Sequence, residues 1–327
     1  MTTSFDTVNQ AWLIRFLKHR INDLRMIRLI QKWLKAGILE DGIVTINETG
    51  TGQGSVVSPL LANVYLHYVF DLWAERWRRR EASGDMIIVR YADDIIVGFQ
   101  YETDARRFWD AMRERLAEYS LSLHLEKTRL IEFGRFAADQ RARRGLGKPE
   151  TFNFLGFTFI CGKTRSGKFQ IKRKTRPDRM RAKLKMLKRE MWRRMHQSIP
   201  AQGKWLWYVV QGYFNYHAVH TNARSLDVFR HLVTDLWRRT LRRRSQKDRI
   251  TWERMTKLAD DWLPKPRVLH PWPSERFAVT HPRWEKLWGG RRRLWHLHRL
   301  HELMEAAPCC KSMISAEAWS RLIRSRP

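Results

Sequence analysis

Two adjacent carboxylates, Asp93 and Asp94, are the side chains of this 327-residue chain that are best suited to metal chemistry. They occupy a short polar corner between two apolar, β-branched runs, residues 86–89 and 95–97. Such runs joined by a tight corner predict a β-hairpin with the carboxylates at its tip. Carboxylates bind hard divalent cations, and a pair of such cations can stabilise the attacking and leaving oxygens of a nucleotidyl transfer. Because aspartates are common in turns, this hypothesis depends on the apolar strands on both sides and on Tyr91 and Ala92 before the pair.

A second segment could bring the backbone close to phosphates. Gly52, Gln53 and Gly54 precede Ser58 and Pro59, a pair that predicts a helix with a Ser N-cap and Pro in its first turn. Glycines allow a close approach, Gln53 can hydrogen-bond a base or sugar, and a helix N-terminus favours phosphate. Without the hairpin, a turn and a helix cap would explain these residues better.

The elements that must position these segments begin with residues 12–34, where apolar side chains recur at helical spacing. Asn22 and Asp23 should split this stretch into two helices, and we expect Gly37 to end the second. Residues 38–50 alternate apolar and polar, as in a small hairpin. The helix opened at Ser58 should turn these side chains inward: Leu60, Leu61, Val64, Tyr65, Tyr68, Val69, Leu72 and Trp73.

After the central hairpin, residues 103–119 predict an amphipathic helix. We expect strands at residues 121–125, 130–133 and 154–159, and an exposed loop at residues 134–150. This order of helices and strands predicts an α+β fold, an antiparallel sheet with helices packed on one face.

Beyond about residue 170 the pattern becomes helical and strongly basic. Residues 172–176 lead into a helix with Met180, Leu184, Leu187 and Met191 on one face, and further helices are expected around residues 205–220 and 225–245. A proline-rich stretch at residues 262–283 should wrap as a loop. The second half therefore predicts an all-helical basic bundle.

The composition points to a polyanionic partner. The net charge is +30, from 63 Lys and Arg against 33 Asp and Glu, and nucleic acid is the commonest partner of such an excess. Many of the 16 Trp lie among cations and could stack bases, although a core position is the commoner role of any single Trp. Three Cys without metal or disulfide spacing favour the cytoplasm, and no apolar run is long enough to span a membrane. The 12 His form no convincing ligand set, and His217 and His220 should be solvated or face phosphates.

Four motifs in order resemble the palm of group II intron-encoded reverse transcriptases, which are also maturases. The likeness covers roughly residues 1–285. The motifs are Gly52-Gln53-Gly54 with Ser58-Pro59-Leu60, Tyr91-Ala92-Asp93-Asp94, Leu125-Glu126-Lys127-Thr128 and Phe154-Leu155-Gly156-Phe157.

This resemblance implies an RNA-directed DNA polymerase that uses Mg²⁺ and dNTPs, with Asp93 and Asp94 as catalytic metal ligands. It implies that Gln53 and Gly54 lie against the incoming nucleotide and that Lys127 lies near its phosphates. The turn formed by Phe154, Leu155, Gly156 and Phe157 would be the primer grip. Expected partners are intron RNA, template-primer and a DNA target.

The resemblance also implies a division into a partial palm at residues 1–165, a thumb and maturase domain at residues 166–285, and a basic tail at residues 286–327. Residues 212–216 and 271–277 resemble recurrent motifs of the maturase part. A cationic, aromatic-bearing bundle suits structured RNA, which is recognised largely by shape and backbone contacts. The tail has no nuclease-like ligand set, so a DNA endonuclease domain is not expected.

The chain departs from the family at its start. Ser4-Phe5-Asp6 resembles the end of the first palm strand, which gives Phe5 the aromatic position that discriminates against ribonucleotides. The family's third metal-binding Asp would then fall before Met1, and we do not assign that role to Asp6. We therefore expect a truncated member without fingers, which would need an N-terminal fragment or a dimer partner for full activity.

Three functions compete. The first is RNA-templated DNA synthesis, the second is a non-catalytic RNA-binding maturase that stabilises folded intron RNA, and the third is a basic structural protein with a chance Asp pair. The ordered motifs argue against the third. We expect this chain alone to bind RNA more convincingly than it polymerises.

Overall fold

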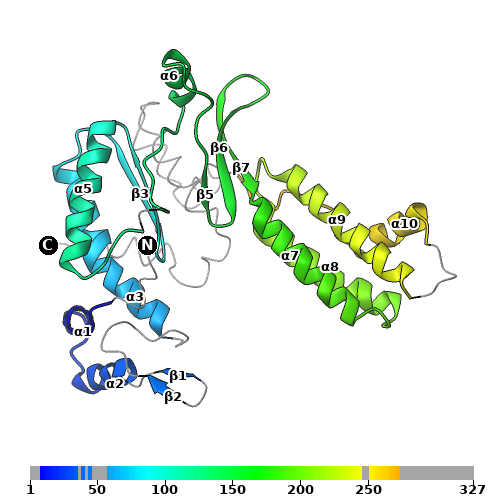
Figure 1. The fold of residues 1–327 in the computed structure, drawn as a ribbon, viewed down its shortest axis with the longest axis horizontal. Helices are drawn as coiled ribbons and strands as arrows, with labels where there is room; N and C mark the ends of the chain where they lie inside the picture. Colours follow the sequence, from blue (N-terminus) through cyan, green and yellow to red (C-terminus); the bar gives the residue numbers. More distant parts are fainter. Residues whose placement is uncertain are drawn as a thin grey trace, which may run out of the picture. The chain divides into compact units, whose positions relative to one another are not determined.

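The computed structural model describes residues 8–35, 38–40, 43–45, 57–124, 126–244 and 250–272. The chain divides into two compact units, residues 1–130 and 131–327 (Figure 1). Both combine helices with small antiparallel sheets, so the predicted α+β class is confirmed. None of the described helices is long and apolar enough to cross a membrane.

The first unit opens with the two expected helices, α1 (Gln10–Lys18) and α2 (Leu24–Lys35). Asn9 caps α1, since its side chain accepts hydrogen bonds from two backbone N–H groups, and the Asp23 carboxylate accepts one from the backbone of Arg25. The predicted split at Asn22 and Asp23 is therefore confirmed. Two short strands come next and pair antiparallel, β1 (Ile38–Glu40) and β2 (Ile43–Thr45).

One long helical segment then crosses the first unit. It consists of α3 (Ser58–Leu66), a π-helical turn η1 (His67–Asp71) and α4 (Leu72–Arg80). Helical geometry begins at Ser58 itself, so Ser58 is not the N-cap that the sequence suggested. Leu60 and Leu72 are exposed, against the prediction. For Leu72 the reason is η1, which shifts the buried face by one residue to Ala74 and Trp77.

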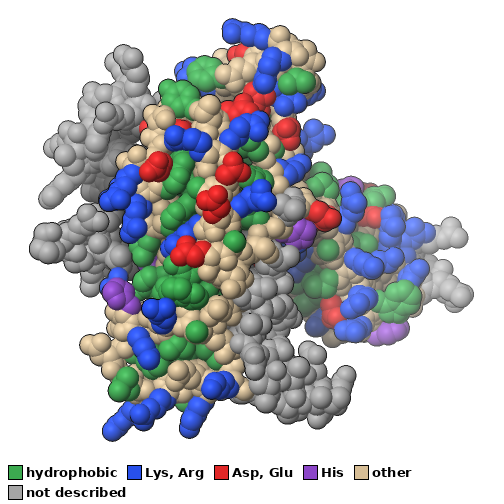
Figure 2. Space-filling view, turned by 60° about the vertical axis from the view of Figure 1, so that its left-hand side comes forward, with side chains coloured by type: hydrophobic (Ala, Val, Ile, Leu, Met, Phe, Trp, Pro, Cys, Tyr) green, Lys and Arg blue, Asp and Glu red, His purple; other side chains and the backbone are tan. Residues whose placement is uncertain are grey.

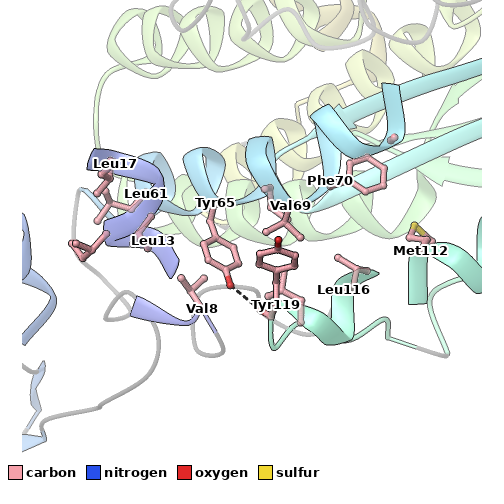
Figure 3. Close-up of a cluster of buried hydrophobic side chains, with 14 of the residues drawn as sticks. Val8, Leu13, Leu17, Leu61, Tyr65, Val69, Phe70, Met112, Leu116 and Tyr119 are labelled. Carbon is pink, nitrogen blue, oxygen red and sulfur yellow. Dashed lines mark hydrogen bonds between the residues drawn. The ribbon is translucent and has the colours of Figure 1, made fainter. Parts of the chain in front are cut away.

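The predicted central hairpin is confirmed. It is formed by β3 (Met86–Tyr91) and β4 (Asp94–Phe99), and α5 (Glu102–Glu118) packs along it (Figure 1). Figure 3 shows the core between the long helical segment and α5, where Tyr65 donates a 2.8 Å hydrogen bond to the carbonyl of Tyr119.

The strands predicted at residues 121–125 and 130–133 are wrong, because the described residues of both stretches form no strand. After α5, Ser120 adopts a left-handed φ of 57°, and the N–H groups of Ser120 and Leu121 bond back to the carbonyls of Ala117 and Leu116. This Schellman motif turns the chain and places Leu121 in the core instead of in a strand.

The second unit begins with α6 (Ala137–Arg143), which lies within the stretch predicted as a loop. A three-stranded antiparallel sheet comes after it, in the order β5 (Phe152–Phe154), β6 (Phe157–Lys163) and β7 (Phe169–Thr175). The single strand predicted at 154–159 is therefore a hairpin. Residues 172–175 form the end of β7, because they continue its register with β6, and the helical part starts later than predicted.

The expected helical bundle is confirmed (Figure 1). Its buried core includes Leu187, Leu206, Phe214, Phe229 and Trp237. The helices are α7 (Pro177–Arg193), α8 (Ile199–His217), α9 (Ala223–Arg242) and α10 (Trp252–Trp262).

Candidate active site

The carboxylate pair lies at the tip of the β3–β4 hairpin. Tyr91 pairs with Asp94, which leaves Ala92 and Asp93 as a two-residue turn. Asp94 is exposed, and Asp93 is partly exposed. The geometry therefore places two consecutive hard oxygen donors at a short hairpin corner, as the sequence predicted.

The turn stores backbone strain next to the carboxylates. Ala92 has a φ of 51°, a left-handed conformation that costs a residue with a Cβ about 1–2 kcal/mol. Two-residue hairpin loops favour turns with positive φ at the first central position, where glycine is the usual residue. The surrounding structure must hold this corner in place.

Arg90 supplies that support from the end of β3. Its Nε and Nη2 donate hydrogen bonds of 2.7 and 2.6 Å to the carboxylate of Asp71. Its Nη1 donates to the Asn63 side-chain oxygen at 2.8 Å and to the Ala92 carbonyl at 2.9 Å. We call Arg90, Asp71 and Asn63 the arginine clamp. It connects the hairpin corner to the long helical segment.

The acidic member of the clamp is held ionised. Burial by itself would raise the pKa of Asp71, but hydrogen bonds from His67 and Arg90 outweigh it and hold that pKa below its usual range. Asp71 therefore keeps the charge that pairs with Arg90. Sequence reasoning missed the clamp, although Arg90 is the one charged residue within an otherwise apolar strand, a signal that could have identified it.

Of the other residues predicted to contact the nucleotide, Lys127 lies within the described part of the chain. Lys127 is exposed in a turn after α5, where its backbone N–H donates to the carbonyl of His124. Phe5, Gln53 and Gly54 lie outside the described residues. Within the described ranges, no group of three or more His, Cys, Asp or Glu side chains could hold a metal ion.

The predicted primer grip is the turn between β5 and β6. Leu155 and Gly156 both have positive φ, 46° and 78°, and Tyr216 of α8 donates a 2.8 Å hydrogen bond to the Leu155 carbonyl. The side chains of Phe154 and Phe157 are buried, and Phe157 stacks on Tyr216. Leu155 and Gly156 are therefore the accessible part of this turn.

His217 is half-buried, whereas the sequence predicted a solvated or phosphate-facing ring. Its ring stacks on Tyr213 and its Nδ1 lies 3.1 Å from the Tyr213 carbonyl. Burial lowers the pKa of His217 from 6.5 to about 4. His220 instead stacks on Trp272, with ring centroids 3.8 Å apart. Neither arrangement resembles a metal site.

Three exposed cations lie on one face of α7 in the second unit. Arg181, Lys185 and Lys188 are exposed and spaced by four and three residues, which places them on one helix face. The ion pairs at the ends of α7 use other residues, and among the described carboxylates none pairs with these three. Figure 2 shows Lys and Arg side chains spread widely over one face of the molecule. We call Arg181, Lys185 and Lys188 the α7 stripe.

The sequence of this chain is similar to known proteins. A family described as "Reverse transcriptase (RNA-dependent DNA polymerase)" matches residues 1–159. The group II intron-encoded protein LtrA of Lactococcus lactis is 46% identical over 63 residues, which are 19% of this chain and 10% of LtrA. Protein YkfC of Escherichia coli is 27% identical over 203 residues, or 52% of this chain and 48% of YkfC.

A third relative is an uncharacterized 91 kDa protein in the cob intron of Schizosaccharomyces pombe. It is 48% identical over 63 residues, which are 19% of this chain and 8% of that protein. The chain thus spans about half of YkfC and about a tenth or less of the other two relatives. Over the matched stretches, the chain is similar to the group II intron-encoded protein LtrA and to these other two proteins.

Proposed function

We propose that this chain takes part in RNA-directed DNA synthesis and in splicing of a group II intron, because residues 1–159 match the reverse transcriptase family. The proposal assigns a partial palm to residues 1–165, a thumb and maturase domain to residues 166–285 and a basic tail to residues 286–327. Its partners would be intron RNA, a template-primer and a DNA target, in the cytoplasm.

The carboxylate pair at the hairpin tip is the main support for a role in DNA synthesis. Asp93 and Asp94 offer the hard oxygen donors that Mg²⁺ prefers. Water molecules and substrate phosphates usually supply the other ligands of a protein-bound Mg²⁺. When bound, the ion would supply charge stabilisation for phosphoryl transfer. Since the described residues hold no third ligand nearby, two carboxylates would bind it weakly on their own.

The resemblance assigns further roles to other residues of the chain. Lys127 is exposed, as a residue that meets the triphosphate of a dNTP must be. Gln53, Gly54 and Phe5 would contact the nucleotide, and the turn at Leu155 would hold the primer end.

A second function, RNA binding without catalysis, is favoured by the α7 stripe. Three exposed cations on one helix face, unpaired by described carboxylates, suit a phosphate backbone. This function does not need a complete metal centre. We therefore rank RNA binding above polymerisation for this chain by itself.

Primer extension and RNA binding by the purified chain test this ranking. We expect tight, salt-sensitive binding of folded intron RNA that Asp93→Ala does not change, together with little extension of a template-primer. Robust extension that Asp93→Ala abolishes would reverse the ranking in favour of an active polymerase. Weak RNA binding at every salt concentration would reject the maturase function.

A further inference from the structure

The arginine clamp depends on an irregularity in the long helical segment. Along a regular α-helix, the eight residues from Asn63 to Asp71 would leave the two side chains about 80° apart around the axis, at 3.6 residues per turn. The π-helical turn η1 adds about one residue to a turn, which rotates the rest of the helix back by about 100°. The N–H of Leu72 bonds to the carbonyl of His67, five residues earlier, as a π-turn requires.

The result is that Asn63 and Asp71 face the same guanidinium. Arg90, a single residue of β3, contacts both side chains. Its four hydrogen bonds, to Asp71, Asn63 and the Ala92 carbonyl, are between 2.6 and 2.9 Å long. π-turns are rare in helices and often occur at functional sites. Here the π-turn has a definite geometric consequence, because it brings Asn63 and Asp71 to the same side of the helix, where both bind Arg90.

The anchors are themselves held in place. The Asn63 amide nitrogen donates a 2.9 Å hydrogen bond to the Pro59 carbonyl, which orients its oxygen toward Arg90. Nδ1 of His67 lies 3.4 Å from the Asp71 carboxylate. The Arg90 side chain is 14% exposed, so its charge is largely removed from water and depends on these partners.

The point of contact on the hairpin is the carbonyl of Ala92. That carbonyl and the N–H of Asp93 belong to one planar peptide unit. Fixing the Ala92 oxygen therefore fixes the peptide plane that leads into Asp93. The same residue, Ala92, carries the left-handed φ of 51°. A strained corner without this contact could relax and redirect the first carboxylate.

We propose that Arg90 is a positioning residue that, anchored by Asp71 and Asn63 across the π-turn, holds the Ala92–Asp93 peptide and so aims the Asp93 carboxylate. The inference deepens the proposed function and rests on it only where metal binding is concerned. Because Asp71 neutralises the guanidinium, the clamp can orient Asp93 without adding net positive charge beside a cation.

The test uses the full chain labelled with ¹³C at alanine methyl groups. Arg90→Lys keeps the positive charge but cannot bridge three acceptors in a planar fork. We expect the Ala92 methyl signal to shift and to show a lower order parameter in Arg90→Lys. Arg113→Lys is the matched control, because Arg113 is an exposed arginine of α5 in the same unit, and it should leave the signal unchanged.

Asn63→Ala is a milder second variant, for the case that Arg90→Lys fails to fold. It removes one anchor and leaves the Arg90–Asp71 ion pair intact, so we expect a smaller change of the same kind. An Ala92 methyl that keeps its shift and order parameter in a folded Arg90→Lys protein, or in Asn63→Ala if that is the folded variant, would overturn the proposal.

A titration with Mn²⁺ then separates the clamp from the proposed function. In the wild type we expect paramagnetic broadening of the Ala92 methyl that Asp93→Asn removes, and in Arg90→Lys a several-fold higher Mn²⁺ concentration for the same broadening. Broadening that is equal in the wild type and in Asp93→Asn would reject the metal site and thus the proposed function. The methyl order parameter would still decide the clamp.

Discussion

At the scale of single residues, the hairpin corner combines a predictable feature with an unpredictable one. The carboxylate pair and its strands follow from residue types alone, because β-branched runs and a polar corner leave little choice. The left-handed conformation of Ala92 does not, since alanine carries no preference for it. The fork of Arg90 also depends on partners 19 and 27 residues away in the sequence.

The strain at Ala92 gives a direct prediction. Ala92→Gly removes the clash of the Cβ but loosens the unfolded chain, so we expect a net gain in stability of about 0–1 kcal/mol. Chemical denaturation measures it. Ala105→Gly is the control, because Ala105 lies inside α5 with an ordinary helical backbone and should lose about 1 kcal/mol or more. Equal losses in both variants would contradict the strain.

At the scale of elements, sequence periodicity identified most helices but could not locate their irregularities. The helices at the start of the chain and in the bundle were predicted because their apolar spacing is regular. The π-turn η1 escaped prediction, because a one-residue shift looks like noise in a pattern of apolar residues, and so Leu72 was placed inward. The strand expected at 121–125 failed because Ser120 carries no glycine-like signal for its left-handed turn.

The packing of α8 makes the second unit sensitive to acid. The pKa of His217 is about 4 in the folded state against an ordinary 6.5, so between these values the unfolded chain binds more protons. The neutral ring therefore contributes fully to the free energy of unfolding above about pH 6.5. As the pH falls toward 4, the protein loses at most about 3 kcal/mol of this free energy.

Denaturation of the wild type and His217→Gln at pH 7 and pH 5 checks this. The wild type should lose clearly more stability between the two pH values than the variant does. Equal losses would mean that His217 titrates normally in the folded protein.

At the scale of the whole molecule, the net charge of +30 predicts that RNA binding depends on the salt concentration. Each phosphate contact should contribute about −0.7 to −0.9 to the slope of log affinity against log salt. Replacing the α7 stripe by Arg181→Gln, Lys185→Gln and Lys188→Gln should weaken RNA binding and make the slope shallower by about two units or more.

The matched control removes the same charge from exposed arginines outside α7, through Arg76→Gln, Arg80→Gln and Arg113→Gln. Filter binding across a salt series compares the two triple variants. An equal change in slope would show that net charge alone attracts the RNA, without a preferred surface on α7.

The central claim, that the hairpin tip holds a divalent cation, is tested most directly by placing a cleaving ion there. Fe²⁺ bound in place of Mg²⁺ reduces added hydrogen peroxide to hydroxide and a hydroxyl radical, which cuts the nearby backbone, and added ascorbate reduces the resulting Fe³⁺ back to Fe²⁺. We predict cleavage between residues 90 and 95 that excess Mg²⁺ suppresses and Asp93→Asn abolishes. Cleavage elsewhere only, or a cut at the tip that survives Asp93→Asn, would contradict the claim.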